Sequence, residues 1–184
     1  MTYDKEAFLE FLRYLDNKVD RHLEVVAVGG SALSMLDLKA ETKDIDIMLL
    51  NCSDDVILEI ADKIMEKYPE KEVDIWANYK MAVHKDGRIF YQEFPRDCCN
   101  TLPTEPVAFK NIELKLLNPL DILVSKIGRN SADDLSDMVS IVRRYAFKKE
   151  EVENRFNLYM QSYGGSKSAV QSNFKYVIET LFGS

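Results

Sequence analysis

The sequence predicts an α/β fold, of the α+β kind, in which a mixed β-sheet is flanked by helices and followed by a C-terminal helical subdomain. Helical and strand-like runs alternate from residue 4 to 68, strand-like runs fill residues 72 to 117, and helical signals alone follow. A chain of 184 residues, 46% of them hydrophobic, is long enough to bury one ordinary core. We therefore expect a core domain over residues 1–117 and a helical subdomain over residues 118–184.

The elements predicted up to residue 68 alternate between helix and strand. Apolar residues recur at the spacing of one helical face within residues 4–20. The run LEVVAV that follows is rich in β-branched residues and ends at glycines, which is typical of a buried strand. A short helix is expected over residues 31–38 and a second strand, DIDIMLL, over residues 44–50. A good N-cap serine and two acids then predict an amphipathic helix over residues 53–68.

Further strands are predicted in the middle of the chain. EVDIWANY, residues 72–79, is expected to be a third strand, and RIFYQEF, residues 88–94, a fourth. PVAFKNIELKLL, residues 106–117, is expected to form a hairpin that turns near Lys110 and Asn111. Together these segments indicate a mixed sheet rather than a uniformly parallel one.

The C-terminal third begins with two strong helix signals. Asn118 suits an N-cap and Pro119 suits the first helical position, which predicts a helix over residues 119–128. Ser131 and the acids after it predict the start of the next helix. Two further helical runs carry the chain to its end.

The charge balance limits the partners of the protein. The chain has 24 Lys+Arg against 31 Asp+Glu, and its net charge of −7 repels a phosphate backbone. This argues against a general nucleic-acid-coating protein and leaves one confined basic patch as a candidate, formed by Arg143, Arg144, Lys148, Lys149 and Arg155. The start of the chain lacks the apolar run of a secretion signal, and no segment approaches ~18 uninterrupted apolar residues. We expect a cytoplasmic protein with no membrane partner.

Two aspartates on the second predicted strand suggest metal chemistry. The fingerprints of dinucleotide-binding and phosphate-cradling NTPase loops are both missing after the first strand. Strand alternation instead sends Asp44 and Asp46 to one face, ~6.5–7 Å apart along the strand. Carboxylates so placed can share a pair of Mg²⁺ ions, which favour oxygen ligands. The chemistry that suits this pair is phosphoryl or nucleotidyl transfer.

The glycines before this strand fit the same chemistry. Gly29 and Gly30 lie at a strand-to-helix turn, where they leave no side chain to obstruct a phosphate chain. Backbone N–H groups at the helix N-terminus could then bind phosphate, with the Ser31 hydroxyl as an added donor. The sequence therefore predicts metal and phosphate sites that face each other.

These motifs resemble those of a known superfamily. VGG, followed after thirteen residues by DIDI, resembles the signature of the DNA polymerase β-like nucleotidyltransferases. KIGRNSADDLSD, residues 126–137, is similar to the pattern that closes the minimal nucleotidyltransferases related to the type IV abortive-infection toxins. The resemblance covers the chain to about residue 147 and implies a nucleotidyltransferase fold.

The resemblance implies roles for individual residues. Asp44 and Asp46 would bind the metals, and Lys126 would meet the nucleotide phosphates. The triphosphate would be held by Gly29, Gly30 and Ser31. A third carboxylate is expected on a later strand, and Asp74 is the first choice, with Glu113 as the alternate. Asp134 and Asp137 are expected to be capping and packing partners of Lys126 or Arg129 rather than metal ligands.

The implied activity is Mg²⁺-dependent nucleotidyl transfer, with two ions. An acceptor on RNA or protein would attack the α-phosphorus of a nucleoside triphosphate such as ATP, releasing pyrophosphate, while Asp74 helps to deprotonate the acceptor. The resemblance also implies a toxin-like enzyme with an antitoxin-like protein partner. Two alternatives remain open: an inactive nucleotidyltransferase-fold binding module, and a metal-dependent phosphohydrolase that uses the same acid pair.

Overall fold

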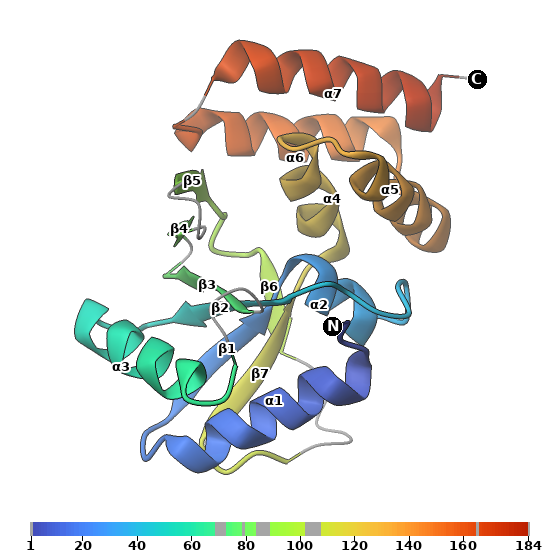
Figure 1. Ribbon diagram of the computed structural model, residues 1–184. Helices are drawn as coiled ribbons and strands as arrows, with labels where there is room; N and C mark the ends of the chain where they lie inside the picture. Colours follow the sequence, from blue (N-terminus) through green and yellow to red (C-terminus); the bar gives the residue numbers. More distant parts are fainter. Residues whose placement is uncertain are drawn as a thin grey trace.

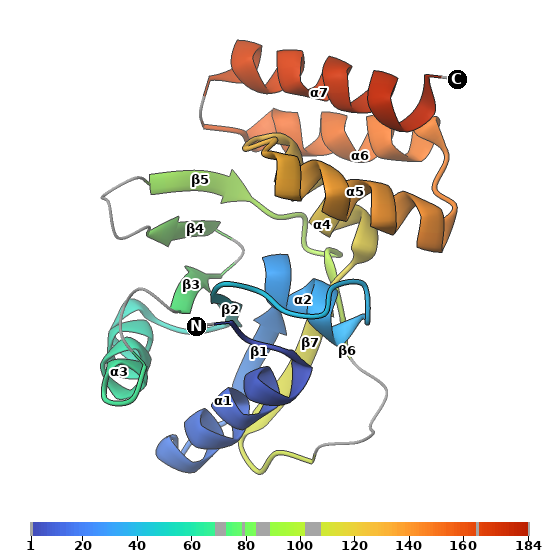
Figure 2. The same cartoon turned by 45° about the vertical axis from the view of Figure 1, so that its right-hand side comes forward.

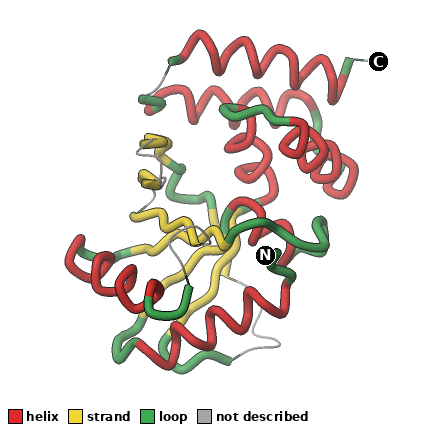
Figure 3. Tube along the Cα trace, viewed as in Figure 1, coloured by secondary structure: helices red, strands yellow, loops and turns green. Residues whose placement is uncertain are grey.

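The structure is a computed structural model that describes residues 2–68, 73–78, 80–83, 89–101, 108–164 and 166–183. Strands gather in the centre of the molecule and helices surround them (Figure 3). The helices are α1 (Lys5–Lys18), α2 (Gly29–Met35), α3 (Asp54–Met65), α4 (Pro119–Ile127), α5 (Ala132–Tyr145), α6 (Lys149–Ser162) and α7 (Lys167–Phe182). The strands are β1 (Leu23–Ala27), β2 (Ile45–Leu50), β3 (Val73–Ala77), β4 (Lys80–Val83), β5 (Ile89–Glu93), β6 (Cys99–Thr101) and β7 (Ile112–Leu117).

In the described part of the chain, seven strands form one sheet in the order β5-β4-β3-β2-β1-β7-β6. Two neighbouring pairs are parallel, β1 with β7 and β2 with β3. The other neighbouring pairs are antiparallel. The sheet is therefore mixed, and the predicted α/β class is confirmed.

Local sequence signals explain where several helices begin. The carboxylate of Asp4 accepts a hydrogen bond from the backbone N–H of Ala7 at the start of α1. Asn118 precedes α4 and Pro119 occupies its first position, as predicted. Ser131 and Asp134 form a reciprocal capping box at the start of α5. The side chains of Asp4 and Ser131 satisfy backbone N–H groups that would otherwise have no partner within the helix, whereas the side chain of Asn118 makes no capping hydrogen bond.

Two predictions for the middle of the chain were incomplete. The short strand β4 was not predicted, although it pairs with both β3 and β5. The predicted hairpin over residues 106–117 is only partly visible, because residues 106 and 107 lie outside the described residues. Residues 108–111 are not strand, and β7 instead pairs with β1 and β6. Residues 72, 79 and 88, at the ends of other predicted strands, also lie outside the described residues.

Helices α4 to α7 lie together beyond one end of the central strands (Figures 1 and 2). Three aromatic rings connect them to the sheet. The ring centroid of Phe94 lies 5.4 Å from that of Trp76 of β3 and 5.8 Å from that of Tyr159 of α6. The Tyr159 hydroxyl donates a 2.8 Å hydrogen bond to the buried Asp121 of α4. The division at residues 117 and 118 into core and subdomain stays a prediction.

The hydrophobic core is shared by the sheet and the C-terminal helices. Val26 and Ile47 of the sheet belong to the same buried cluster as Ile122, Met138 and Val152 of the helices. Among the described helices, none is long and apolar enough to cross a membrane.

Candidate active site

Three carboxylates meet at the start of strands β2 and β3. Asp44 precedes β2, Asp46 lies in it, and Asp74 lies in β3 as the direct cross-strand neighbour of Asp46. One oxygen from each of the three residues lies within 4.8 Å of the others. The parallel β2–β3 pairing therefore places three oxygen ligands around one point, as a divalent cation requires.

The alternate third carboxylate lies elsewhere in the sheet. Glu113 is on β7, opposite Glu24 of β1, and Glu24 is opposite Leu50 at the far end of β2. Leu50 is four residues beyond Asp46, or ~13 Å along the strand. The carboxylate of Glu113 contacts Lys115 at 3.5 Å instead. The structure thus brings Asp74, and not Glu113, to the aspartate pair.

The environment of Asp46 disfavours its negative charge. Burial raises the pKa of Asp46 to about 7, and the nearby charges of Asp44 and Asp74 add to this effect. The backbone N–H of Gly30 and the charge of Lys126 act in the opposite direction. The three carboxylates carry more negative charge than the neighbouring groups offset, and a bound divalent cation would neutralise it. Three carboxylate oxygens are also ligands that Mg²⁺ favours, so these residues fit Mg²⁺.

The raised pKa predicts a pH-dependent stability difference in the absence of metal. Folded Asp46 holds its proton up to about pH 7, whereas the unfolded side chain loses it near ~3.9. The contribution of Asp46 to folding is thus present at low pH and lost as the pH rises from about 4 to 7.

We expect Asp46→Asn to match the wild type in melting temperature near pH 4, to exceed it increasingly as the pH rises to about 7, and to show the full difference at pH 8. The difference should be roughly 2–4 °C for each kcal/mol that burial and repulsion of the charged carboxylate cost the wild type. Thermal unfolding in chelator across this pH range measures this. Equal melting temperatures at pH 8 would show that the buried charge of Asp46 costs the folded protein no stability.

The glycine turn fits tightly against strand β2. Gly29 has a positive φ of 50°, and a Cβ there would lie 2.4 Å from Oδ2 of Asp46. The N–H of Gly30 donates a 2.9 Å hydrogen bond to the same carboxylate oxygen. The Ser31 hydroxyl is fully buried and accepts a 2.9 Å hydrogen bond from the backbone N–H of Asp46. The glycine turn that was predicted to bind phosphate therefore fixes the position of the Asp46 carboxylate.

A side chain at position 30 is expected to destabilise the protein. A Cβ on Gly30 would lie 2.1 Å from Oγ1 and 2.8 Å from Cβ of Thr42. We expect Gly30→Ala to cost about 1–3 kcal/mol, the range for overpacking a filled site. The matched control is Gly128→Ala, because a Cβ on Gly128 meets only the Tyr163 hydroxyl, at an ordinary 3.9 Å. Urea unfolding of both variants tests this, and equal midpoints would contradict it.

Thr42 is a site residue for which the sequence analysis predicted no role. Its side chain is buried, and its hydroxyl donates to Oδ1 of Asp44 at 3.4 Å. Two 2.8 Å backbone hydrogen bonds pair Thr42 with Tyr3 near the N-terminus. Its position two residues before Asp44, on the same face of an extended segment, was the available signal.

Lys126 lies within a network of buried charges beside the carboxylates. Its ammonium group is 3.2 Å from Asp134 and 2.8 Å from Asp137, and the residue is only 7% exposed. Arg129 donates two hydrogen bonds to Asp134, of 2.6 and 2.7 Å. The predicted partnership of both acids with Lys126 or Arg129 is confirmed: Asp134 contacts both cations and Asp137 contacts Lys126. The contact between Lys126 and nucleotide phosphates stays a prediction.

The charges of Arg129 and Lys126 interact electrostatically with carboxylates of the candidate site. Burial opposes ionisation of Asp134, but hydrogen bonds from Arg129 and Ser131 hold the pKa of that carboxyl well below its usual value. The hydrogen bond to Asp134 raises the pKa of Arg129, and the charges of Asp46 and Asp44 raise it further. Asp134 and Arg129 therefore both stay charged around neutral pH, and the charges of Lys126 and Arg129 act on the neighbouring carboxylates.

The predicted basic patch is smaller than the sequence indicated. Arg155 is used in the interior, where it binds Asp121 at 2.8 Å and Asp97 at 2.9 Å. The other four residues of the patch are exposed at the end of α5 and the start of α6: Arg143, Arg144, Lys148 and Lys149. Tyr145, between them, is 37% exposed and stacks on Phe147.

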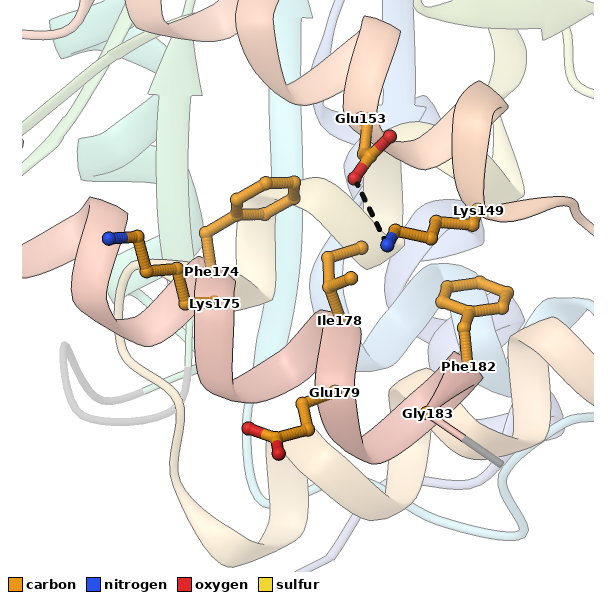
Figure 4. Close-up of a pocket in the computed structure, with 8 residues that line it drawn as sticks. All are labelled: Lys149, Glu153, Phe174, Lys175, Ile178, Glu179, Phe182 and Gly183. Carbon is orange, nitrogen blue, oxygen red and sulfur yellow. Dashed lines mark ion pairs between the residues drawn. The ribbon is translucent and has the colours of Figure 1, made fainter.

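A pocket of about 390 Å³ lies between α6 and α7 (Figure 4). Phe174 and Ile178 project into the space between the two helices, and Lys149 forms a 3.8 Å ion pair with Glu153 across one side (Figure 4). The lining residues are Lys149, Glu153, Phe174, Lys175, Ile178, Glu179, Phe182 and Gly183. None of the residues predicted for the catalytic or nucleotide-binding sites lines this pocket, although Lys149 of the basic patch does.

Comparisons with known proteins place these features in a family. The model of a family described as "Nucleotidyltransferase of unknown function (DUF6036)" matches residues 6–178. No curated protein matches the chain. Among solved structures, an antigenic nucleotidyltransferase-like protein from Paracoccidioides brasiliensis matches over 100% of both chains, with 14% sequence identity and a TM-score of 0.45. The residues matched by the family include the carboxylates, the glycine turn and the Lys126 network.

Proposed function

The chain belongs to the nucleotidyltransferase family of unknown function DUF6036, and from this premise we propose that it transfers a nucleoside monophosphate from a nucleoside triphosphate to an acceptor, with Mg²⁺. The family confirms the general class that the sequence predicted. The observation that carries the finer proposal is the convergence of Asp44, Asp46 and Asp74, with oxygens within 4.8 Å of one another. Membership of the type IV abortive-infection toxin branch is part of the proposal.

The three carboxylates have different roles in the proposed reaction. An acceptor oxygen forms a bond to the α-phosphorus, the bond from that phosphorus to the pyrophosphate oxygen breaks, and the acceptor proton passes to Asp74. Asp44 and Asp46 would hold two Mg²⁺ ions, which neutralise charge on the phosphates when bound. The Gly30 N–H hydrogen bond keeps the Asp46 carboxylate oriented for this task.

Positive and polar groups around the carboxylates suit a triphosphate. We propose that Lys126 contacts the phosphates and that the turn of Gly29, Gly30 and Ser31 lies beside them. The electrostatic effect of Lys126 on Asp46 supports a position within reach of the same ligand. Fixed charges of this kind accelerate phosphoryl transfer mainly by positioning the substrate and stabilising its charge.

The proposed acceptor is RNA or a protein, and the proposed biological role is that of a toxin held in check by an antitoxin-like protein. A net charge of −7 repels a long polyanion, so an RNA acceptor would be held by a confined patch. Arg143, Arg144, Lys148 and Lys149 are the exposed candidates. A protein acceptor would show almost no salt dependence.

The experiment that tests the function supplies ATP labelled at the α-phosphate, Mg²⁺ and, separately, total cellular RNA and protein extract. We expect stoichiometric pyrophosphate and a label on one acceptor class, both lost in Asp44→Asn. Release of inorganic phosphate with no labelled acceptor would indicate a phosphohydrolase. Failure to bind any Mg²⁺–nucleotide would indicate an inactive binding module.

A further inference from the structure

Lys39 shares a carboxylate oxygen with Lys126. It lies in the segment between α2 and β2, which runs along the side of the core that faces α4 and α5 (Figure 1). Its ammonium nitrogen is 3.1 Å from Oδ2 of Asp137, and that of Lys126 is 2.8 Å from the same oxygen. The two ammonium groups are therefore no farther apart than these two distances together.

Within the ion pairs of Asp134 and Asp137, the cations outnumber the carboxylates. Three cations, Lys39, Lys126 and Arg129, meet only two carboxylates, Asp134 and Asp137. Two ammonium groups on one oxygen repel each other, and an additional anion would relieve that repulsion. The arrangement thus favours a further negative ligand between the two lysines.

Lys39 is the more accessible member of this pair. Its side chain is 30% exposed, against 7% for Lys126, and both of its hydrogen bonds in the described structure go to Asp137. An ammonium group has three donor hydrogens, so Lys39 retains capacity for another acceptor. The oxygens of a phosphate chain are acceptors of the right charge.

We propose that Lys39 is a second phosphate-binding cation, which joins Lys126 in holding the β- and γ-phosphates of the bound triphosphate. This inference rests on the proposed nucleotidyl transfer. The α-phosphate must lie at Asp44, Asp46 and Asp74 for the reaction to occur there. Lys126 is close enough to Asp46 for its charge to act on that carboxylate, and Lys39 lies beside Lys126 on Asp137, so both lysines are near the rest of a phosphate chain bound there. Lys39 is a binding residue in this account, and Asp137 positions it.

A purely structural role for Lys39 makes a different prediction. The same segment forms a second ion pair with the same helix, between Lys43 and Asp133 at 3.2 Å. That pair is highly exposed, with side chains 82% and 69% accessible, and it has no neighbouring cation on its carboxylate among the described contacts. Lys43 is therefore a matched control for an ion pair that merely ties the segment to α5.

The test compares dissociation constants of ATP, ADP and AMP, each with Mg²⁺, for the wild type, Lys39→Met, Lys39→Arg and Lys43→Met. We expect Lys39→Met to weaken the binding of ATP by at least ~10-fold, that of ADP by less and that of AMP by under ~2-fold, because charge-assisted hydrogen bonds to the β- and γ-phosphates are lost. Lys39→Arg should restore most of the ATP affinity, and Lys43→Met should leave it unchanged. An ATP affinity unaltered in folded Lys39→Met overturns the proposal.

A second measurement uses the wild-type protein and so does not depend on a variant that folds. Amine acetylation followed by peptide mass spectrometry reports the accessibility of each lysine. We expect Mg²⁺–ATP, and not AMP, to slow the labelling of Lys39 while Lys43 is labelled at an unchanged rate. Binding of ATP with no protection of Lys39 overturns this inference and leaves the proposed function standing. No ATP binding at all overturns both.

Discussion

Replacing Asp46 with asparagine is expected to abolish Mg²⁺-dependent nucleotidyl transfer while the protein stays folded. Asparagine has the same shape, and its carbonyl oxygen can still accept the 2.9 Å hydrogen bond from Gly30. It removes the charge that a divalent cation needs, and metal ions contribute several kcal/mol to the transition state. We expect the rate to fall at least ~10³-fold, which corresponds to about 4 kcal/mol. Pyrophosphate release and Mg²⁺ titration by calorimetry measure both effects.

Two further substitutions show whether the loss is specific to the carboxylate group. Asp74→Asn should reduce the rate to a similar degree, because Asp74 shares the group with Asp46. Glu113→Gln should leave the rate nearly unchanged, because Glu113 lies on β7 and contacts Lys115. If Glu113→Gln were inactive and Asp74→Asn active, the third carboxylate would be wrongly assigned. Full activity in Asp46→Asn would show that Asp46 does not bind a metal ion needed for the reaction.

The second large effect is expected on stability, from Asp134→Ala. The carboxylate of Asp134 is fully buried and accepts hydrogen bonds from Lys126, from Arg129 and from both the backbone and the hydroxyl of Ser131. Its removal leaves Lys126 buried with one partner fewer and removes one of the two hydrogen bonds of the capping box of α5, the one from the backbone N–H of Ser131. Breaking a buried pair of this kind costs about 3–5 kcal/mol. Denaturant unfolding should show a correspondingly lower midpoint.

The neighbouring aspartate provides the control for this prediction. Asp133 is one residue earlier in α5, and its pair with Lys43 is exposed to solvent. Asp133→Ala should therefore change the free energy of unfolding by less than about 1 kcal/mol. Equal effects of the two substitutions would show that the buried network contributes no more than a surface ion pair.

The sequence predicted the helices and the central strands well because their signals are local. The N-caps of α4 and α5 and the alternation in β2 depend on residues close together in the chain. β4 was missed because four residues are too few for a periodic pattern to emerge. The partners of β7 were also missed, since its pairing with β1 joins segments about ninety residues apart in sequence.

The candidate site was predictable to the extent that it depends on strand alternation. Alternation placed Asp44 and Asp46 on one face, but the choice between Asp74 and Glu113 depended on which strand neighbours β2. That neighbour is β3, whose register aligns Asp74 with Asp46. The sharing of Asp137 by two lysines could not be predicted, because one lysine is 98 residues away from it. Long-range contacts of this kind have no signature in a local pattern.

Lys39 and Asp137 are in contact but lie 98 residues apart in the sequence, which affects the order in which the molecule folds. During synthesis from the N-terminus, the segment with all three carboxylates emerges before α4 and α5. Until those helices dock, Asp44, Asp46 and Asp74 repel one another without the cations that offset them. Contacts across 98 residues form slowly, because a long loop must close first. In a nascent chain of this protein, the proposed nucleotide site therefore stays incomplete until the helices have been made and have packed against the sheet.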